Sequence, residues 1–373
     1  MFRAPKSDFD RLSRHRVGAP IEPLAEYPGF DWLRIFLASA VFWVHAGSVE
    51  HFNFAGDLFV QIFFALSGFL IGGIILRMTK ADLPRFFYNR TIRIWLPFFA
   101  AVGVLYLAAY LKEGFAPYFW QSLAYDLTFT HNLFIEKTPE VIAALPMHGT
   151  GSHFWSIAVE EQFYLMAPLL IIFVPLAKYW FAWVFIAIIA TVFGMWYGSV
   201  SAGVLGAMLQ RRFGNWHVHP VATLALVSIA AIIAFCWAND IFEYRYMVPV
   251  LAIVVVLLCA RPGLRTPFST WVGGISFPMY LNHWIGLFVA GAIASRVPGV
   301  GALAADLFGF ALSILVAAYA YKLIDQKLYA HRSHWYSPAL GYITIIAVYA
   351  LMAVGLALGL YVIGPLNQAP VTA

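Results

Sequence analysis

The stretch Tyr179–Leu209 reads YWFAWVFIAIIATVFGMWYGSVSAGVLGAML, and its division into helices decides the topology of the whole chain. A helix needs about 20 mostly apolar residues to cross a bilayer. These 31 residues are therefore more than one crossing needs and fewer than two full crossings need. Gly194, Gly198 and Gly203 favour a break between two short helices, because glycine weakens a helix interior.

The distribution of lysine and arginine decides between these two topologies, because cytoplasmic loops of membrane proteins carry an excess of both residues. Two short helices give eleven spans with the N-terminus inside, and 18 lysines and arginines then fall in cytoplasmic segments. Lys112, Lys137, Arg245 and Arg296 fall outside, and Arg34 lies within a span. A single long span inverts the later loops and leaves 13 inside against 9 outside. The sequence therefore predicts a cytoplasmic N-terminus and a break within this stretch.

The composition agrees with a membrane protein. The chain has 373 residues, of which 62% are hydrophobic and 11% are charged, whereas soluble domains carry roughly 25% charged residues. We predict an all-α, polytopic transmembrane bundle of about 10–11 spans. Besides Tyr179–Leu209, the expected spans are Phe30–Ser48, Leu58–Leu76, Ile92–Leu111, Trp155–Ala177, Val221–Trp237, Tyr246–Ala260, Trp271–Ile293, Ala302–Ile324 and Leu340–Ile363.

One membrane domain is expected over residues 30–330. Residues 1–29 form a basic cytoplasmic tail without the apolar run of a signal peptide. Residues 331–373 add a C-terminal transmembrane helix and a short tail. Residues 112–153 form the longest extracytoplasmic loop, in which FAPYFWQSLAYDLTFTHNLF is amphipathic rather than spanning. This segment is either a lid on the outer surface or an interfacial anchor.

Several classes of function are disfavoured. Cys236 and Cys259 lie in apolar runs, so we expect neither a disulfide framework nor a metal site. The net charge of +5 is attributed to cytoplasmic loops, and we expect no nucleic-acid partner. The sequence contains no Walker A, HExxH or GxGxxG motif.

Ionisable side chains inside a bilayer cost about 2.5–3.5 kcal/mol at mid-helix and mark function by default. The first expected span contains FDWLRIFLASAVFWVHAG, in which Arg34 and His45 are eleven residues apart. This is about three helical turns, so both lie on one face, roughly 16 Å apart along the axis. His45 in the outer half is a candidate general base or transient acyl acceptor. Alternatively, Arg34 snorkels to lipid phosphate and His45 only hydrogen-bonds between helices.

The fourth expected span begins SHFWSIAVEEQFYLMAPLL and carries two adjacent glutamates. Glu160 is expected at about the depth of His45, where a carboxylate can orient an imidazole and stabilise its charged form. Glu161 points about 100° away and needs another partner. Structural carboxylates are the weaker interpretation, since unpaired charges in hydrocarbon are costly.

Three further segments carry polar residues. GDLFVQIFFALSGFLIGG contains Asp57 and Ser67, and we interpret the Ser67-Gly68 pair as a small-residue helix contact rather than a nucleophile. RFFYNRTIRIWLPFF spaces its arginines to offer guanidinium forks to phosphates, the alternative being ordinary positive-inside anchoring. ISFPMYLNHWIGLF places a second intramembrane imidazole, His283, beside Tyr280 and Asn282.

In this order the segments resemble the acyltransferase-3 family of integral membrane O-acyltransferases, over about residues 30–330. The matches are Arg34 and His45 to its Arg-x10-His, FFALSGFLI (Phe63–Ile71) to FFxLSGFLI, Arg90 and Arg93 to RxxR, WSIAVEEQFYL (Trp155–Leu165) to WSLxVEEQFYL and YLNHW (Tyr280–Trp284) to YLxHxP. The chain departs from the pattern at Ile285, where the family has proline. It departs again at Asp325-Gln326-Lys327, where the family has Glu-x-Pro.

The resemblance implies acyl-CoA, expected to be acetyl-CoA, as a cytoplasmic donor, and no permanently bound cofactor. It implies a hydroxyl of a glycan, polysaccharide or lipid-linked sugar as the outer acceptor, and a multi-pass protein of the bacterial inner membrane in contact with membrane lipids. His45 and Glu160 are the expected catalytic pair. The expected substrate-binding residues are Arg34, Arg90, Arg93, Glu161, Asp57, Ser67, Trp155, Tyr164, Tyr280, Asn282 and His283. The competing interpretation is a proton-coupled or glycan transporter that uses the same His, Glu and Arg residues.

Overall fold

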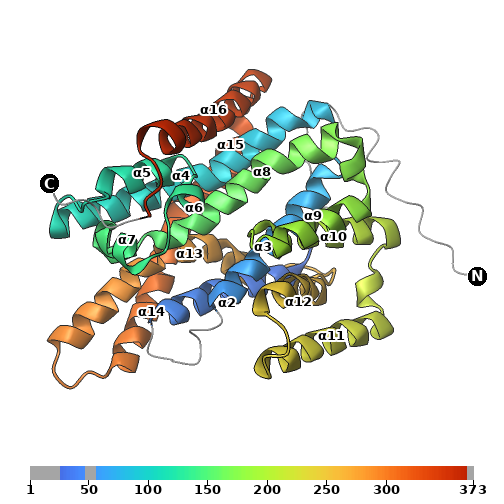
Figure 1. Cartoon of the computed structure of the whole chain (residues 1–373). Helices are drawn as coiled ribbons and strands as arrows, with labels where there is room; N and C mark the ends of the chain where they lie inside the picture. Colours follow the sequence, from blue (N-terminus) through green and yellow to red (C-terminus); the bar gives the residue numbers. More distant parts are fainter. Residues whose placement is uncertain (1–25, 47–55, 368–373) are drawn as a thin grey trace, which may run out of the picture.

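The computed structural model describes residues 26–46 and 56–367 of the chain. This part is helical and contains no named strand, which confirms the predicted all-α polytopic fold (Figure 1). Seven of the described helices are long and apolar enough to cross a membrane, and two shorter apolar helices, Trp180–Val192 and Tyr244–Cys259, accompany them. The predicted end of the first span, Ser48, lies outside the described residues.

Eleven of the described helices coincide with the predicted spans. They are α2 (Pro28–Ala46), α3 (Gly56–Ile75), α4 (Leu83–Glu113), α8 (Trp155–Phe173), α9 (Trp180–Val192), α10 (Tyr197–Phe213), α11 (Pro220–Ala238), α12 (Tyr244–Cys259), α13 (Pro267–Arg296), α14 (Ala302–Ala320) and α16 (Pro338–Ala357). The α14 helix continues through a π-helical turn, Tyr321–Asp325, into α15 (Gln326–Trp335).

The predicted break within residues 179–209 is confirmed, since α9 ends at Val192 and α10 begins at Tyr197. Gly194 adopts φ +67°, which side chains with a Cβ rarely tolerate, and it makes the turn. Gly203, by contrast, lies inside α10, where an added Cβ would meet the carbonyl oxygen of Ala65. Gly68 of α3 approaches the carbonyl of Val200 in the same way. These two glycines let the α3 and α10 backbones touch, which is a common device in membrane helix packing.

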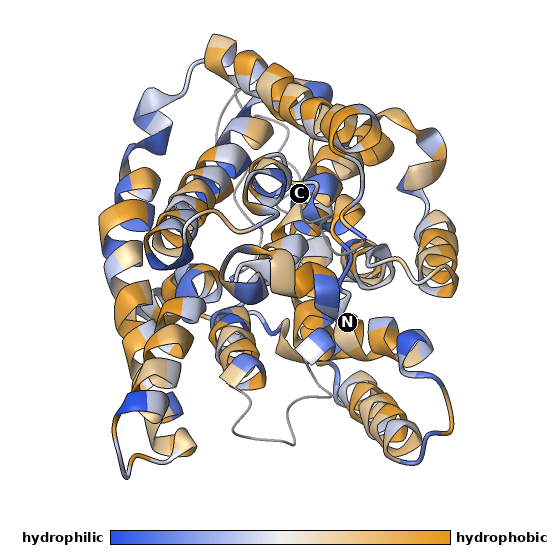
Figure 2. Ribbon diagram, turned by 60° about the vertical axis from the view of Figure 1, so that its left-hand side comes forward, coloured by the Kyte–Doolittle hydropathy of each residue, from blue (hydrophilic) through white to orange (hydrophobic). Residues whose placement is uncertain are grey.

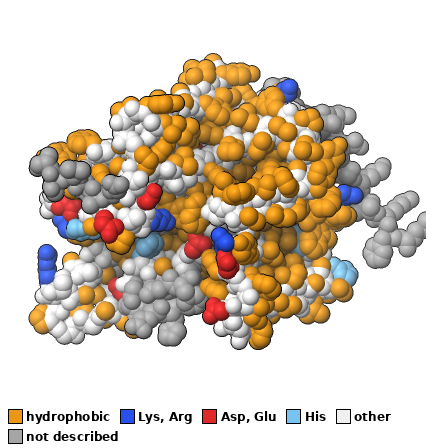
Figure 3. Space-filling model, in the orientation of Figure 1, with side chains coloured by type: hydrophobic (Ala, Val, Ile, Leu, Met, Phe, Trp, Pro, Cys, Tyr) orange, Lys and Arg blue, Asp and Glu red, His pale blue; other side chains and the backbone are white. Residues whose placement is uncertain are grey.

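The centre of the bundle is formed by α2, α3, α10 and α13, whereas α11 lies at its edge (Figure 1). Along α11 Leu226 is buried and most other side chains are exposed. Hydrophobic residues dominate the outer helices, and the face in Figure 3 is largely hydrophobic, with charged side chains gathered in a few places (Figures 2 and 3). Apolar side chains on such a surface are suited to face lipid.

The predicted loop of residues 112–153 begins at the end of α4 and contains three short α-helices, α5 (Phe119–Leu127), α6 (His131–Phe134) and α7 (Pro139–Ala144), followed by two 3-10 turns. None of the three is long enough to cross a bilayer, as predicted. Tyr125 lies in a small separate core and donates its hydroxyl to the carbonyl of Gly364 over 2.5 Å. An isolated parallel bridge joins Ile135 to Leu366. The end of the described chain is therefore fastened to this loop.

Candidate active site

A cavity of about 800 Å³ lies in the centre of the bundle, within the size range of ordinary ligand pockets. Its charged end collects residues from the ends of several helices, including Tyr27 before α2, Arg77 after α3 and Arg265 before α13. Its other end is lined by aromatic and hydroxyl side chains, among them Phe63, Ser156 and Tyr280. Among the described residues, the arginines that line it are Arg34, Arg77, Arg85, Arg90, Arg93, Arg211, Arg265 and Arg332.

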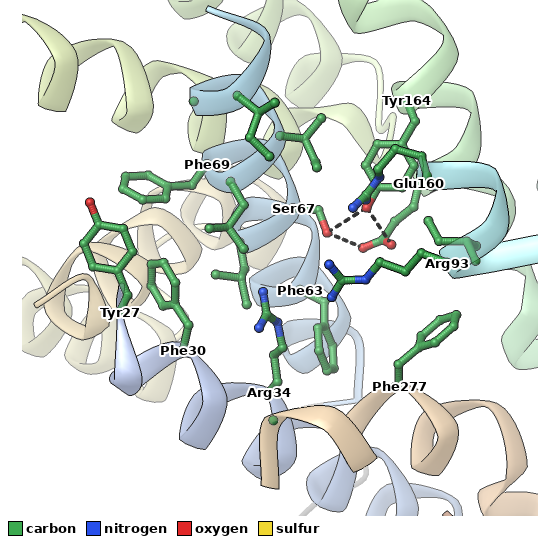
Figure 4. Close-up of a pocket in the computed structure, with 18 of the residues that line it drawn as sticks. Tyr27, Phe30, Arg34, Phe63, Ser67, Phe69, Arg93, Glu160, Tyr164 and Phe277 are labelled. Atoms are coloured by element: carbon green, nitrogen blue, oxygen red, sulfur yellow. Dashed lines mark hydrogen bonds between the residues drawn. The ribbon is translucent and has the colours of Figure 1, made fainter. Parts of the chain in front are cut away.

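The predicted phosphate-binding arginines face this cavity, as Figure 4 shows for Arg93. The guanidinium of Arg90 lies over the ring of Tyr164 at 4.0 Å from its centroid, and that of Arg93 lies 5.7 Å from the ring of Tyr329. These aromatic faces hold the guanidinium groups without consuming all of their N–H donors. Simple anchoring at the membrane surface therefore does not describe Arg90 and Arg93.

Arg34 also points into the cavity rather than toward lipid, so the snorkelling interpretation is wrong (Figure 4). One turn earlier on α2, Asp31 is 1% exposed and lies 3.7 Å from Arg34. Asp31 also accepts hydrogen bonds from Nε and Nη2 of Arg265, and this pairing raises the pKa of Arg265. Neither Asp31 nor Arg265 was predicted as a site residue. The position of Asp31, three residues before Arg34 on the same helix, could have indicated an ion pair between them.

Glu160 forms a hydrogen-bonded group with two hydroxyls in the cavity wall (Figure 4). Ser67 of α3 donates to its Oε1 over 2.6 Å, and Tyr164 donates to its Oε2 over 3.0 Å. The two hydroxyl oxygens are 3.2 Å apart. Ser67 is therefore more than a helix contact, while its neighbour Gly68 makes the close helix approach.

Glu161 points to a different set of neighbours, as predicted from the 100° step between consecutive helical residues. Its Oε2 accepts a hydrogen bond from the indole N–H of Trp95 over 2.8 Å. Glu161 is not among the cavity-lining residues. The structure therefore separates the two adjacent glutamates, and only Glu160 reaches the cavity.

His45 lies outside the cavity, near the other end of α2, and is exposed. Its Nδ1 is 2.9 Å from the carbonyl of Val41, which leaves Nε2 without a hydrogen-bond partner among the described residues. Its ring is 5.2 Å from that of His283, measured between centroids. The expected partnership with Glu160 is not formed, because that carboxylate is bonded to Ser67 and Tyr164 instead.

A third histidine, His153, completes a histidine cluster with His45 and His283. The His153 and His283 ring centroids are 4.7 Å apart, and both residues are buried. The Nδ1 of His283 lies 2.8 Å from the carbonyl of Tyr280, while the Nε2 of His153 lies 3.3 Å from that of Leu281. His153 precedes the glutamate segment by a few residues, and its position in that apolar run was the signal that it belonged to the site.

The remaining predicted residues lie away from the cavity. Trp155 is in edge contact with the ring of Phe64 and has the ammonium of Lys137 4.0 Å from its centroid. Asp57 accepts a 3.4 Å hydrogen bond from Gln61 one turn later. Asn282 donates to the carbonyl of Pro278 within α13, so its contact is local to that helix.

A family model described as an acyltransferase domain matches residues 27–322. The chain belongs to the acyltransferase-3 family. It is therefore an acyltransferase and a multi-pass membrane protein, which favours the enzyme over the competing transporter interpretation. No solved structure matches it significantly.

Two curated relatives of this acyltransferase-3 chain are informative. Nodulation protein 10 of Rhizobium leguminosarum bv. viciae is 29% identical over 161 residues, which cover 38% of this chain and 43% of that protein. O-acetyltransferase OatA of Staphylococcus aureus is 29% identical over 168 residues, which cover 39% of this chain and 25% of OatA. The matched part thus spans less than half of either relative.

Proposed function

We propose that this acyltransferase moves an acyl group, expected to be acetyl, from acyl-CoA in the arginine-lined cavity to a hydroxyl of a glycan or lipid-linked sugar on the side of His45. The observation that carries the proposal is the position of the cavity. Arginines from several helices line it, and its hydroxyl groups at Ser156 and Tyr280 adjoin the histidine cluster.

The charged end of the cavity suits the nucleotide part of coenzyme A, which carries a diphosphate and a further phosphate. Arginine binds phosphate through a planar fork of N–H donors. Arg93 of α4 and Arg34 of α2 approach the cavity from different sides (Figure 4), and Arg90 lies about one turn before Arg93 on α4. Phe63 and Phe277 line the cavity beside Arg34 and Arg93 and suit the less polar arm that carries the thioester (Figure 4).

The exposed side of the histidine cluster suits the acceptor. If Nδ1 of His45 donates to the Val41 carbonyl, Nε2 carries the lone pair that a general base needs. A hydroxyl acceptor and an acetyl group agree with the name of OatA as an O-acetyltransferase. We assign the arginine-lined end to the cytoplasm on the strength of the loop charges. Because both relatives are bacterial proteins, we place this chain in the bacterial inner (cytoplasmic) membrane.

The proposal is tested by replacing His45 in host cells that lack the chromosomal gene. His45→Ala is expected to abolish the acetyl esters that the wild-type gene adds to envelope glycans, measured by mass spectrometry at equal membrane abundance. His331→Ala is the matched control, because His331 is also exposed and also has Nδ1 beside the carbonyl of the residue four positions earlier. It should retain wild-type ester levels. Full acetylation by His45→Ala would refute the assignment of His45.

A further inference from the structure

Two hydroxyl groups close the inner end of the cavity. The Tyr280 hydroxyl of α13 lies 2.5 Å from Oγ of Ser156 on α8. Both hydroxyls also lie within hydrogen-bond distance of the carbonyl of His153, Ser156 at 3.0 Å and Tyr280 at 3.2 Å. Ser156 and Tyr280 line the cavity although they are only 4% and 6% exposed. The ring of Phe63 packs edge-on against that of Tyr280.

The histidine cluster lies on the side of this hydroxyl pair that faces away from the cavity. The carbonyl of Tyr280 itself is 2.8 Å from Nδ1 of His283, and the His283 ring is the neighbour of His45. His153, whose carbonyl contacts both hydroxyls, lies against His283 as well. A single layer of side chains thus separates the proposed donor cavity from the proposed base.

The number of protons on the two hydroxyls limits the hydrogen bonds that the pair can make. Each hydroxyl has a single proton to donate. If Ser156 donates to the His153 carbonyl, Tyr280 donates to Oγ of Ser156. Tyr280 can then exchange that acceptor for a ligand oxygen in the cavity, while Ser156 keeps its own bond to the backbone. A carbonyl oxygen at the end of the cavity is such a ligand atom.

We infer that the Tyr280 hydroxyl is the oxyanion donor of the reaction and that the Ser156–Tyr280 pair is the gate between donor and acceptor. The inference rests on the proposed function. When Tyr280 releases Ser156 and turns its O–H to the thioester carbonyl, the pair parts and the acceptor meets the donor between Tyr280 and His45. The acceptor oxygen bonds to the thioester carbon as its proton passes to Nε2 of His45, and the carbonyl oxygen becomes an oxyanion held by the O–H of Tyr280. Collapse breaks the C–S bond. The thiolate takes a proton from water in the cavity, and His45 loses its proton on its exposed side.

The test uses membranes from host cells in which the chromosomal gene is replaced by each variant. They are supplied with radiolabelled acetyl-CoA, and label in envelope glycans is counted. Binding of coenzyme A to the purified proteins is measured by calorimetry. Tyr280→Phe keeps the ring that packs on Phe63 and removes the hydroxyl. It should lower kcat by about 10²–10³-fold, the usual loss for one oxyanion donor, with the Kd for coenzyme A unchanged.

Two further variants separate catalysis from stability. Ser156→Ala should lower kcat by less than Tyr280→Phe, because the tyrosine hydroxyl remains. Tyr349→Phe removes another interhelical tyrosine hydroxyl, which donates to the Leu165 carbonyl over 2.8 Å, and should leave kcat unchanged. If wild-type membranes incorporate no more label than membranes lacking the gene, the proposed function itself fails. If wild type is active and Tyr280→Phe retains its kcat, the oxyanion role of Tyr280 is refuted.

Discussion

The guanidinium of Arg265 holds the carboxylate of Asp31 across 234 residues of chain, with Nε of Arg265 2.6 Å from Oδ2 of Asp31. A second hydrogen bond joins Nη2 to Oδ1, so the contact is a paired fork. It connects the start of α2 to the segment that precedes α13. Arg34 lies 3.7 Å from the same carboxylate and reaches into the cavity. Asp31 thereby fixes two arginines at the charged end.

Asp31→Asn should destabilise the protein by roughly 2–3 kcal/mol, because hydrogen bonds to charged groups contribute about 1.5–3 kcal/mol each and the carboxylate is buried. Thermal unfolding in detergent measures the change. The exposed pair Glu243–Arg245, with N–O separation 2.8 Å, is the control. Glu243→Gln should cost at most about 1 kcal/mol, as surface pairs do. Equal losses in the two variants would contradict the role given to Asp31.

Arg90→Lys and Arg93→Lys should each weaken coenzyme A binding by about tenfold or more, since lysine lacks the planar fork that arginine offers to phosphate. Titration calorimetry with coenzyme A at two salt concentrations measures the effect. Arg212→Lys serves as the control, because Arg212 is not among the cavity-lining residues and lies 5.3 Å from the ring of its neighbour Phe213. Unchanged affinity for coenzyme A in both cavity variants would show that Arg90 and Arg93 do not bind its phosphates.

Glu160→Gln should reduce acetyl transfer by roughly 10–100-fold while coenzyme A binding is not weakened. The carboxylate accepts hydrogen bonds from both Ser67 and Tyr164, and an amide can accept at only one of its two ends. The hydroxyl that loses its acceptor shifts in the cavity wall, and a misplacement of about 1 Å at a site can cost roughly 100-fold in rate. Radiolabel transfer and calorimetry on the same preparation separate the two effects. Glu161→Gln is the companion variant, because Trp95 contacts that carboxylate outside the cavity. It should lower the yield of folded protein and leave the affinity for coenzyme A unchanged.

The helices and the α9–α10 break could be predicted from the sequence because hydropathy and loop charge report on position along the membrane normal. The same argument gave Arg34 and His45 a common helix face. Hydropathy and loop charge could not predict which side chains of other helices contact that face. Glu160 and His45 were paired on depth, yet Glu160 turns toward Ser67 on α3 instead.

Long-range partners were the other limit. The Asp31–Arg265 pair and the His153–His283 contact join residues far apart in the chain, and helical periodicity says nothing about which helices become neighbours. Glycines illustrate the same point. Gly194 makes the predicted turn. Gly203 instead packs against the backbone of α3, and the sequence does not show that α3 is its neighbour.

Gly203→Ala tests that packing directly. An added Cβ would clash with the carbonyl oxygen of Ala65, which is backbone and has little freedom to move away. Overpacking of this kind costs typically about 1–3 kcal/mol, so the variant should unfold at a lower temperature. The matched change, Gly103→Ala in α4, meets nothing within 4 Å and should be neutral or stabilising, because alanine favours helix by about 1 kcal/mol over glycine. Since α3 also carries Ser67, the displaced helix in Gly203→Ala should lower transfer activity as well, whereas Gly103→Ala should not. A Gly203→Ala protein as stable and active as Gly103→Ala would mean that α3 and α10 do not touch as described.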